Sequence, residues 1–387
     1  MFQVKRMVRG IAAVSAGLAF LGCAQVQGPS PAQKGSSDVV GPRKVIALVP
    51  DTNSAGRVRA AAQTAGYEAL DVTRLDGLDL IMLTYRMPLG VTGAQAIATL
   101  EAAAPLSTVG INHAYRLQQQ TAASTLDYAD SMMRWTAGGC PARVPIGVID
   151  TAINTASPAL ADTKIITRTF FEGAPAETTH GTDVALVLTD PDRLRGATLY
   201  GANVFGEDDA TDPVAGADAL VRALDWLADE DVRLVNLALA GPYNKLLNLA
   251  VERATARGLI LVAAVGNDGP RVDPLYPAGF EDVIAVTAVD VDGKIYRNAV
   301  RGPHVDVAAP GVDVMVSSTG RPRFVTGTSI ATPLITARLA ADPSVAAALT
   351  VADVRKELAD TSAELGPEGR DAKFGYGLAL AENICPD

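Results

Sequence analysis

The chain has 387 residues, 48% of them hydrophobic, and this length allows more than one domain with a sizeable core. Its formal net charge is -10, and Lys and Arg form no block along the sequence. Nucleic-acid binding requires a basic face, so we expect no nucleic-acid partner.

The first 23 residues have the pattern of a secretory signal peptide. A basic start precedes an apolar stretch over residues 10–22, which is too short for a membrane span. Residues 20–23 (FLGC) resemble a bacterial lipobox, so Cys23 is the predicted lipidation site. We therefore expect a lipid-anchored protein of the bacterial cell envelope, in the periplasm or at the outer membrane. The alternative is ordinary cleavage after Ala24 and secretion without a lipid.

Two segments have the composition of connections. Residues 24–43 are rich in Gln, Pro, Ser and Gly and cannot bury a core, which predicts a linker. Residues 119–143 form a connector with one amphipathic stretch over residues 126–135.

Between these connections, residues 44–118 alternate strand and helix patterns in the order βαββαβ. This order predicts a small ferredoxin-like α+β domain. A turn is expected at Asp76-Gly77, and Ser54 is the candidate N-cap of the first helix. The expected strands cover residues 44–50, 70–75, 78–86 and 107–117, and the expected helices cover residues 54–69 and 92–104.

From residue 144 to residue 387, apolar runs alternate with helical patterns, which predicts an α/β domain with a doubly wound parallel sheet. A helix is expected over residues 245–257, with Gly258 placed to end it. In such sheets functional residues gather at the carboxyl ends of strands, where Asp150 and Asn267 lie. The expected buried strands cover residues 144–149, 234–240, 259–265 and 283–289.

The three cysteines predict one covalent bond. If Cys23 carries lipid, Cys140 and Cys385 remain as a pair in an oxidising compartment, and a disulfide would tie the two ends of one domain together. The alternative is two unpaired thiols. No CxxC motif or His partner lies nearby, so we expect no zinc site.

Three short motifs place an acid, a base and a nucleophile in the order Asp, His, Ser. Asp150 ends an apolar run, His180 precedes a helix expected over residues 183–188, and Ser329 lies at a loop-to-helix junction. Such a set can transfer a proton from the hydroxyl and form a covalent acyl intermediate. Each residue alone also has a structural interpretation: a strand-end Asp, a core His and a Ser N-cap.

Asn267 lies between His180 and Ser329 in the segment AAVGNDG. An amide N–H there can point at a developing oxyanion, with the backbone N–H of Ser329 as the second donor. The alternative is an Asn turn after a strand. No GxSxG motif surrounds Ser329, which argues against an α/β-hydrolase.

Together these motifs resemble the subtilisin-like serine peptidases, the subtilases of peptidase S8 type. The resemblance covers residues 144–385, and residues 44–118 resemble the inhibitor-like propeptide of the family. It rests on VIDT at 148–151, HGT at 180–182, LNLAVERATARGLILVAAVGNDGP at 247–270, YPAG at 276–279, DVAAPGVDV at 306–314 and GTSIATP at 327–333.

The resemblance implies a serine endopeptidase that is made as a self-inhibited precursor and hydrolyses polypeptides through an acyl-enzyme. Its implied triad is Asp150, His180 and Ser329, with Asn267 in the oxyanion hole. No cofactor or metal is expected, residues 44–118 would be the intramolecular inhibitor, and we expect a monomer. The implied substrate-binding residues are Leu237, Ala238, Leu239, Ala240 and Gly241 on an edge strand, and Ala263, Ala264, Val265 and Gly266 around a side-chain pocket.

Four positions depart from the family pattern. Ala152, Asp183, Ala238 and Ile330 stand where the family usually has Gly, His, Ser and Met. We expect Asp183 to cap the helix that follows His180; if it points inward instead, it would disturb the base. Because of Ala152 and Asp183, the alternative function is a catalytically weak or inactive binding or scaffold protein on a subtilase fold.

Other polar features have structural interpretations. The acidic run at residues 207–212 is expected to be a solvated loop, and residues 290–293 are expected to form a hairpin turn instead of a calcium loop. His113 and His304 are expected to be structural.

Overall fold

A computed structural model describes residues 39–117, 120–122, 128–171, 173–206, 213–317, 322–347 and 350–385. The expected signal peptide, Cys23, most of the linker and the acidic run at 207–212 lie outside this part of the chain. The chain divides into two units, Met1–Gly35 and Ser36–Asp387, and the described residues all belong to the second. No helix in these residues is long and apolar enough to cross a membrane.

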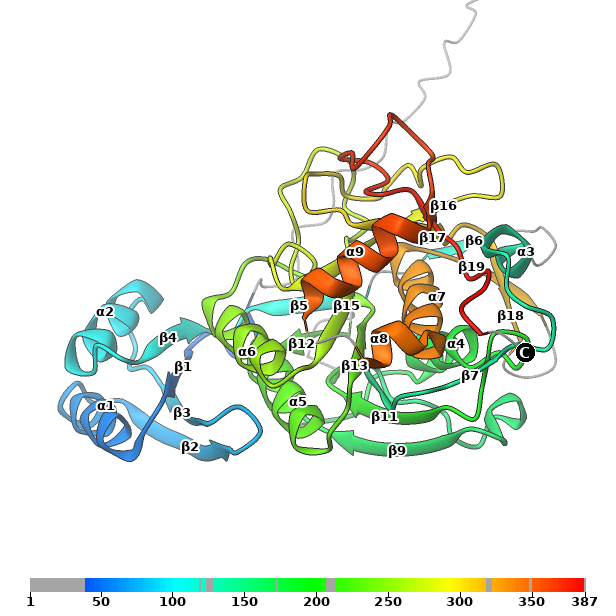
Figure 1. Cartoon of the computed structure of the whole chain (residues 1–387). Helices are drawn as coiled ribbons and strands as arrows, with labels where there is room; N and C mark the ends of the chain where they lie inside the picture. The colour runs from blue at the N-terminus through cyan, green and yellow to red at the C-terminus, as the bar shows by residue number, and fades with distance from the viewer. Residues whose placement is uncertain are drawn as a thin grey trace, which may run out of the picture. The chain divides into compact units, whose positions relative to one another are not determined.

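The N-terminal elements of this unit form an antiparallel four-stranded sheet with two helices (Figure 1). The strand order is β2-β3-β1-β4, as the βαββαβ pattern predicts for a ferredoxin-like arrangement. The last expected strand is divided, because residues 114–117 leave this sheet as β5. The elements are β1 Lys44–Val49, α1 Thr52–Thr64, β2 Glu68–Leu75, β3 Leu80–Arg86, α2 Gly93–Ala103, β4 Thr108–Ile111 and β5 Ala114–Leu117.

The ends of α1 differ from the sequence prediction. The N-cap is Asp51, whose carboxylate accepts a hydrogen bond from the backbone N–H of Ser54 at 2.7 Å, so Ser54 lies in the first turn and is not the cap. The helix ends at Thr64 and not at residue 69, because Gly66 has a φ of +75° and turns the chain into β2.

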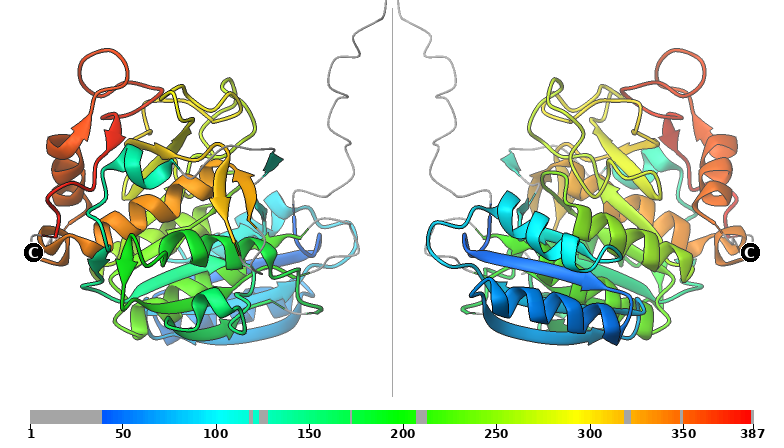
Figure 2. Two further views of the ribbon diagram at one scale, coloured as in Figure 1. Left: turned by 90° about the vertical axis from the view of Figure 1, so that its right-hand side faces the viewer. Right: turned by 90° about the vertical axis from the view of Figure 1, so that its left-hand side faces the viewer.

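The two faces of this small sheet belong to different hydrophobic clusters. Alternate strand residues such as Val45 and Leu83 pack with α1 and α2, which lie on the sheet's outer face (Figure 2). The residues between them, such as Ile46 and Met82, join the large core of the rest of the chain. Strands β1 and β3 are therefore buried on both faces, whereas most of β2 is exposed.

The central sheet confirms the predicted α/β fold. In the described residues its strand order is β20-β21-β17-β16-β15-β13-β8-β11-β9, and every pair is parallel except β20 with β21. The strands are β8 Ile146–Asp150, β9 Lys164–Thr169, β11 Thr198–Asn203, β13 Leu234–Leu237, β15 Ile260–Ala264, β16 Val283–Val289, β17 Val307–Pro310, β20 Ser362–Ala363 and β21 Leu378–Ala379.

Five larger helices accompany this sheet. The fully buried α7 packs against α4 and against four strands of the sheet, and α5 packs against α6. Gly258, with a φ of +93°, follows the end of α6 as predicted. The helices are α4 Thr179–Leu188, α5 Ala217–Asp229, α6 Lys245–Ala256, α7 Thr328–Ala341 and α9 Val351–Thr361.

Short elements complete the described chain, and several of them lie at the edges of the site. They are β6 Gln120–Ala122, α3 Ala129–Met133, β7 Cys140–Pro141, η1 Pro158–Leu160, β10 Leu194–Arg195, β12 Ala215–Gly216, β14 Leu239–Ala240, β18 Val314–Val316, β19 Arg323–Thr326 and α8 Pro343–Ala347.

The connector is packed into the main core from residue 128 onward. Tyr128 is buried, and its hydroxyl donates a hydrogen bond to the carbonyl of Val312 at 2.7 Å. At the other end of this segment, Cys140 is joined to Cys385 by a disulfide with a Cα–Cα distance of 5.7 Å. The bond links residues 245 positions apart, at the two ends of the α/β domain.

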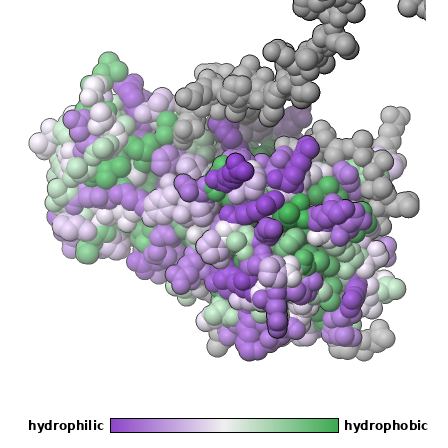
Figure 3. Space-filling view, turned by 90° about the horizontal axis from the view of Figure 1, so that it is seen from above, coloured by the Kyte–Doolittle hydropathy of each residue, from purple (hydrophilic) through white to green (hydrophobic). Residues whose placement is uncertain are grey.

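The surface carries no single dominant apolar face in the view of Figure 3. Hydrophilic residues cover much of it, with smaller hydrophobic patches between them. Among the described residues, the large hydrophobic side chains that are exposed are Leu70, Val72, Leu89, Leu106, Tyr243, Val272 and Val291.

Candidate active site

Asp150 and His180 are in direct contact. Asp150 is the last residue of β8 and is fully buried, and its Oδ1 lies 2.7 Å from Nδ1 of His180. The same oxygen accepts a hydrogen bond from the backbone N–H of Thr151 at 2.6 Å. A buried carboxylate needs such partners, and this one orients the imidazole.

The helix that carries His180 begins four residues earlier than predicted. Its first residue is Thr179, so His180 lies in the first turn of α4. The backbone N–H of Gly181 donates to the hydroxyl of Thr151 at 2.8 Å. A Cβ on Gly181 would lie 2.3 Å from the carbonyl oxygen of Thr151, so only glycine lets α4 approach the end of β8 this closely.

Asp183 does not cap α4, contrary to the sequence prediction. Because the helix starts at Thr179, Asp183 lies inside it and is fully buried, and its Oδ1 pairs with the guanidinium of Arg323. The carboxylate is therefore held by a cation from β19 and not by the helix N-terminus.

Ser329 is the second residue of α7, and Asn267 is fixed beside it. Oδ1 of Asn267 accepts hydrogen bonds from the backbone N–H of Thr328 at 3.1 Å and from the Thr328 hydroxyl at 3.0 Å. Because Oδ1 faces Thr328, the amide orientation of Asn267 is set and its Nδ2 is the donor end. Sequence reasoning found Asn267 but missed Thr328, which has no signal beyond its place before Ser329.

The loop before Asn267 requires its glycine. Gly266 has a φ of +100°, and a Cβ there would lie 2.5 Å from Cδ1 of Leu275. Its N–H donates to the Thr328 hydroxyl at 3.2 Å, which ties the end of β15 to the start of α7. The proposed pocket residues Ala263, Ala264, Val265 and Gly266 are all buried along this segment.

The proposed edge strand is paired with the N-terminal part of the same chain. Its residues 239–240 form β14, which pairs antiparallel with β5, with Leu239 opposite Leu117 and Ala240 opposite Arg116. On its other side β5 pairs antiparallel with β12, with Tyr115 opposite Ala215. Leu237 ends β13, Ala238 is buried between the strands, and Gly241 forms a bridge with Tyr276.

A second antiparallel pairing involves β6, a few residues further along the chain. Gln120 lies opposite Thr326, and Ala122 lies opposite Phe324 on β19. Strand β19 ends three residues before Ser329, so β6 pairs with the segment that leads to this serine. Periodicity in the sequence gave no sign of either pairing, because both are made with residues more than 95 positions away.

The remaining departures cause no visible distortion. Ala152 is not among the non-glycine residues with a positive φ, so this position tolerates a Cβ. Ile330 is fully buried in α7.

The turn expected at residues 290–293 is present, with the N–H groups of Asp292 and Lys294 donating to the Asp290 carboxylate.

The other titratable candidates lie in structural surroundings. His113 Nδ1 lies 3.0 Å from Nδ2 of Asn244, the N-cap of α6. His304 is largely buried, and this burial lowers its pKa, with Asp306 and Arg370 as charged neighbours. Within the described residues, no group of three or more His, Cys, Asp and Glu side chains is arranged to hold a metal ion.

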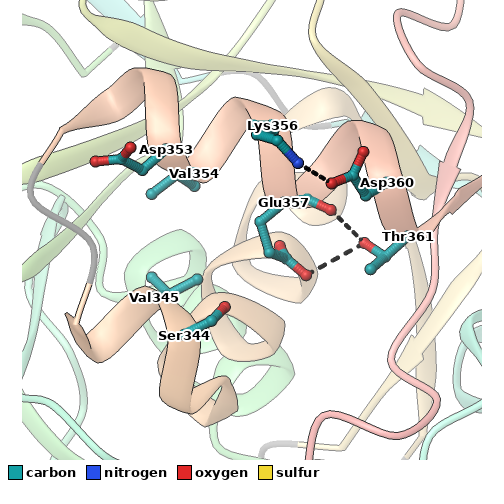
Figure 4. A pocket seen from close by; sticks show the side chains of 8 residues that line it. All are labelled: Ser344, Val345, Asp353, Val354, Lys356, Glu357, Asp360 and Thr361. Atoms are coloured by element: carbon teal, nitrogen blue, oxygen red, sulfur yellow. Dashed lines mark hydrogen bonds and ion pairs between the residues drawn. The ribbon is translucent and has the colours of Figure 1, made fainter.

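A pocket of about 410 Å³ between α8 and α9 contains none of these residues (Figure 4). Glu357, which lines the pocket, is contacted at both carboxylate oxygens by the fully buried Arg338 of α7. Burial raises the pKa of Glu357, and the Arg338 guanidinium opposes this shift. The pocket is lined by Ser344, Val345, Asp353, Val354, Lys356, Glu357, Asp360 and Thr361.

Comparison with known proteins places this geometry in context. Residues 142–377 match the model of Peptidase S8, the subtilase family. The minor extracellular protease Epr of Bacillus subtilis is 29% identical over 255 residues, which cover 63% of this chain and 39% of that protein. Subtilisin DY of Bacillus licheniformis is 29% identical over 255 residues, covering 62% of this chain and 89% of the relative.

Among solved structures, fervidolysin from Fervidobacterium pennivorans, a keratinolytic enzyme related to subtilisin, is similar in fold. The TM-score is 0.73 at 20% sequence identity, and the match covers 88% of this chain and 60% of fervidolysin. The match thus spans less than two thirds of the length of Epr and of fervidolysin.

Proposed function

Because this chain belongs to the subtilase family, we propose that it is a serine endopeptidase whose triad is Asp150, His180 and Ser329. The 2.7 Å contact between Asp150 and His180 carries the proposal. Asp150 holds the proton on Nδ1, so Nε2 takes the proton of Ser329 Oγ and returns it to the leaving amine. Nδ2 of Asn267 stabilises the oxyanion of the tetrahedral intermediate.

A fluorophosphonate label tests this activity directly, because it reacts with an activated serine. The chain lacking residues 1–23 is prepared with and without the Ser329→Ala substitution. We expect wild type to be labelled and to cleave itself, and the variant to do neither. Absence of labelling and cleavage in the wild type would favour the scaffold alternative.

We also propose that residues 44–118 are an inhibitory propeptide. The support is the position of β5 between β12 and β14, where it pairs with the backbone as a peptide substrate does in β-augmentation. Ion pairs join the same region to α6: Glu101 contacts Lys245, and Asp79 contacts the Arg257 that follows the helix. The site is thus covered until the chain is cut.

The two strand registers narrow the cleavage site. The last residue of β5 is Leu117 and the first of β6 is Gln120, and the two strands pair with different partners, β14 and β19, the second of which ends three residues before Ser329. We propose that self-cleavage falls between Leu117 and Gln120. N-terminal sequencing of the processed protein tests this: a mature chain that begins at residue 118, 119 or 120 agrees, and one that begins beyond residue 122 contradicts it.

For location, we propose a lipid-anchored envelope protein, on the basis of the FLGC segment at residues 20–23. Epr is named an extracellular protease, so an exported relative exists. Labelled fatty acid should enter wild type and not Cys23→Ser. If the variant is processed and released like wild type, ordinary secretion is the better account.

A further inference from the structure

The hairpin β18–β19 leads directly to Ser329, because β19 ends three residues before it. Residues 116–117 of this chain pair with β14, and residues 120–122 pair with β19. In the proposed cleavage, the part on β14 is acylated and the part on β19 leaves. Peptide residues after the scissile bond therefore depend on β19, whereas residues before it depend on β12 and β14.

Strand β19 is fixed at both ends. At its C-terminal end, the Thr326 hydroxyl accepts a hydrogen bond from the N–H of Asp313 at 2.8 Å, and Gly327 N–H donates to the Gly311 carbonyl at 2.8 Å. At its N-terminal end, Arg323 pairs with Asp183. That second anchor joins the strand to α4, one turn beyond His180.

Because Asp183 is buried, the ion pair that anchors β19 to α4 is costly to break. The side chain of Asp183 is fully buried, and that of Arg323 is 32% exposed. Breaking an ion pair that has one fully buried member is costly, so the guanidinium is strongly held. The ladder also gives Arg323 a partner in Val316 of β18, but β18 belongs to the same hairpin and cannot fix the hairpin to α4.

We propose that Arg323, held by Asp183, is a positioning residue for the leaving-group side of the substrate. It keeps β19 at a fixed distance from the helix that carries the base, so that the peptide strand after the scissile bond pairs in register. This inference rests on the proposed peptidase function. Neither residue touches the reacting atoms, and their effect acts through β19.

Two matched substrates separate this role from a structural one. The first is a peptide p-nitroanilide with residues only before the scissile bond, and the second is a quenched peptide with the same residues extended by three after it. We compare processed wild type, Arg323→Gln, Arg323→Lys and the double variant Asp183→Asn/Arg323→Gln. The double variant removes both charges of this pair, so the test remains possible if Arg323→Gln alone folds poorly. Lys356→Gln, which removes an exposed ion pair with Asp360, is the control.

For Arg323→Gln and the double variant, kcat/KM for the quenched peptide should fall about tenfold, since small misplacements near a reacting bond are costly. The p-nitroanilide rate should stay within about twofold of wild type, because that substrate makes no contact with β19. Arg323→Lys should recover part of the loss, and Lys356→Gln should match wild type on both substrates. Self-processing of the Arg323→Gln precursor should slow as well, because β6 pairs with β19.

Equal losses on both substrates, or no loss on the quenched peptide, would overturn the proposal. Failure of wild type to hydrolyse the p-nitroanilide or to react with a fluorophosphonate would instead show that the proposed function is wrong, and the positioning role would fall with it. The wild-type control thus distinguishes the two failures.

Discussion

The side-chain carbonyl of Asn267 accepts two hydrogen bonds from one residue, Thr328, which directly precedes Ser329. The helix that carries Ser329 and the side chain of Asn267 are therefore held by a shared contact. A change at Thr328 therefore affects the orientation of the Asn267 amide, whereas a change at Asn267 removes the amide itself.

The first prediction concerns this amide. Asn267→Ala should lower kcat by about 10²- to 10³-fold with little change in KM, because the amide acts on charge that develops only in the transition state. Thr328→Val removes the hydroxyl bond and leaves the N–H bond, so its loss should be smaller. Steady-state kinetics on a peptide substrate measure both. A large rise in KM with unchanged kcat would mean that Asn267 binds substrate instead.

The second prediction concerns pH and the contact between the small sheet and α5. Asp225 accepts a hydrogen bond from the N–H of Leu78 at 3.1 Å, and its burial raises its pKa to about 6 from an ordinary 3.8, with Asp229 and Asp76 adding to the shift. Because the pKa of this carboxyl is raised in the folded precursor, its protonation stabilises the folded state. This stabilisation is fully present below pH 3.8 and is lost as the pH rises through about 6.

The test compares thermal unfolding of the Ser329→Ala precursor with and without Asp225→Asn. Asparagine keeps the acceptor and removes the charge, so the two Tm values should be close at pH 4 and should separate by pH 7, with the asparagine variant more stable. The exposed Asp162→Asn serves as the control. A constant difference across this range would show that Asp225 does not titrate there.

The third prediction concerns the buried cation of α7. Arg338→Leu leaves the carboxylates of Glu357 and Asp342 without their partner, and breaking such a buried pair costs about 3–5 kcal/mol. The matched control is Arg134→Gln, whose exposed pair with Glu382 should contribute no more than about 1 kcal/mol. Denaturant unfolding of the Ser329→Ala chain measures both, and equal effects would contradict the assignment.

The fourth prediction concerns the disulfide. Replacing Cys140 and Cys385 together by serine should lower the free energy of unfolding by about 2–5 kcal/mol, because the bond closes a long loop in the unfolded chain. Reductant should destabilise the unsubstituted protein by a similar amount and leave the double variant unchanged. Free-thiol titration of the unfolded protein provides the independent check, and two reactive thiols without reductant would exclude the bond.

The sequence predicts most of the fold for physical reasons that act locally. Apolar runs identify the buried strands β8, β15 and β16, and Gly258 ends α6 because its φ is positive. Errors fall at element boundaries, where several residues can serve equally well. Asp51 and Ser54 are both good caps, and local sequence alone does not decide between them.

The candidate site is only partly predictable. Asp150, His180, Asn267 and Ser329 were named from their motifs, and the structure brings Asp150 to His180 and Asn267 to the residue before Ser329. The partner of Asp183 could not be found in this way, because Arg323 lies 140 positions away and no periodic pattern connects the two. Contacts between distant segments, including β5 with β14 and β6 with β19, depend on the assembled fold.

The bond between Cys140 and Cys385 also determines what happens when the chain is cut by a protease. It joins two residues that are 245 positions apart, and Asp150, His180 and Ser329 lie between them. A single nick at an exposed loop anywhere inside that ring would leave both fragments covalently linked. Such a nicked molecule would migrate as one species without reductant and as two with it, and it would keep its three functional groups in one particle. The ring therefore keeps a nicked chain together, in addition to its effect on folding.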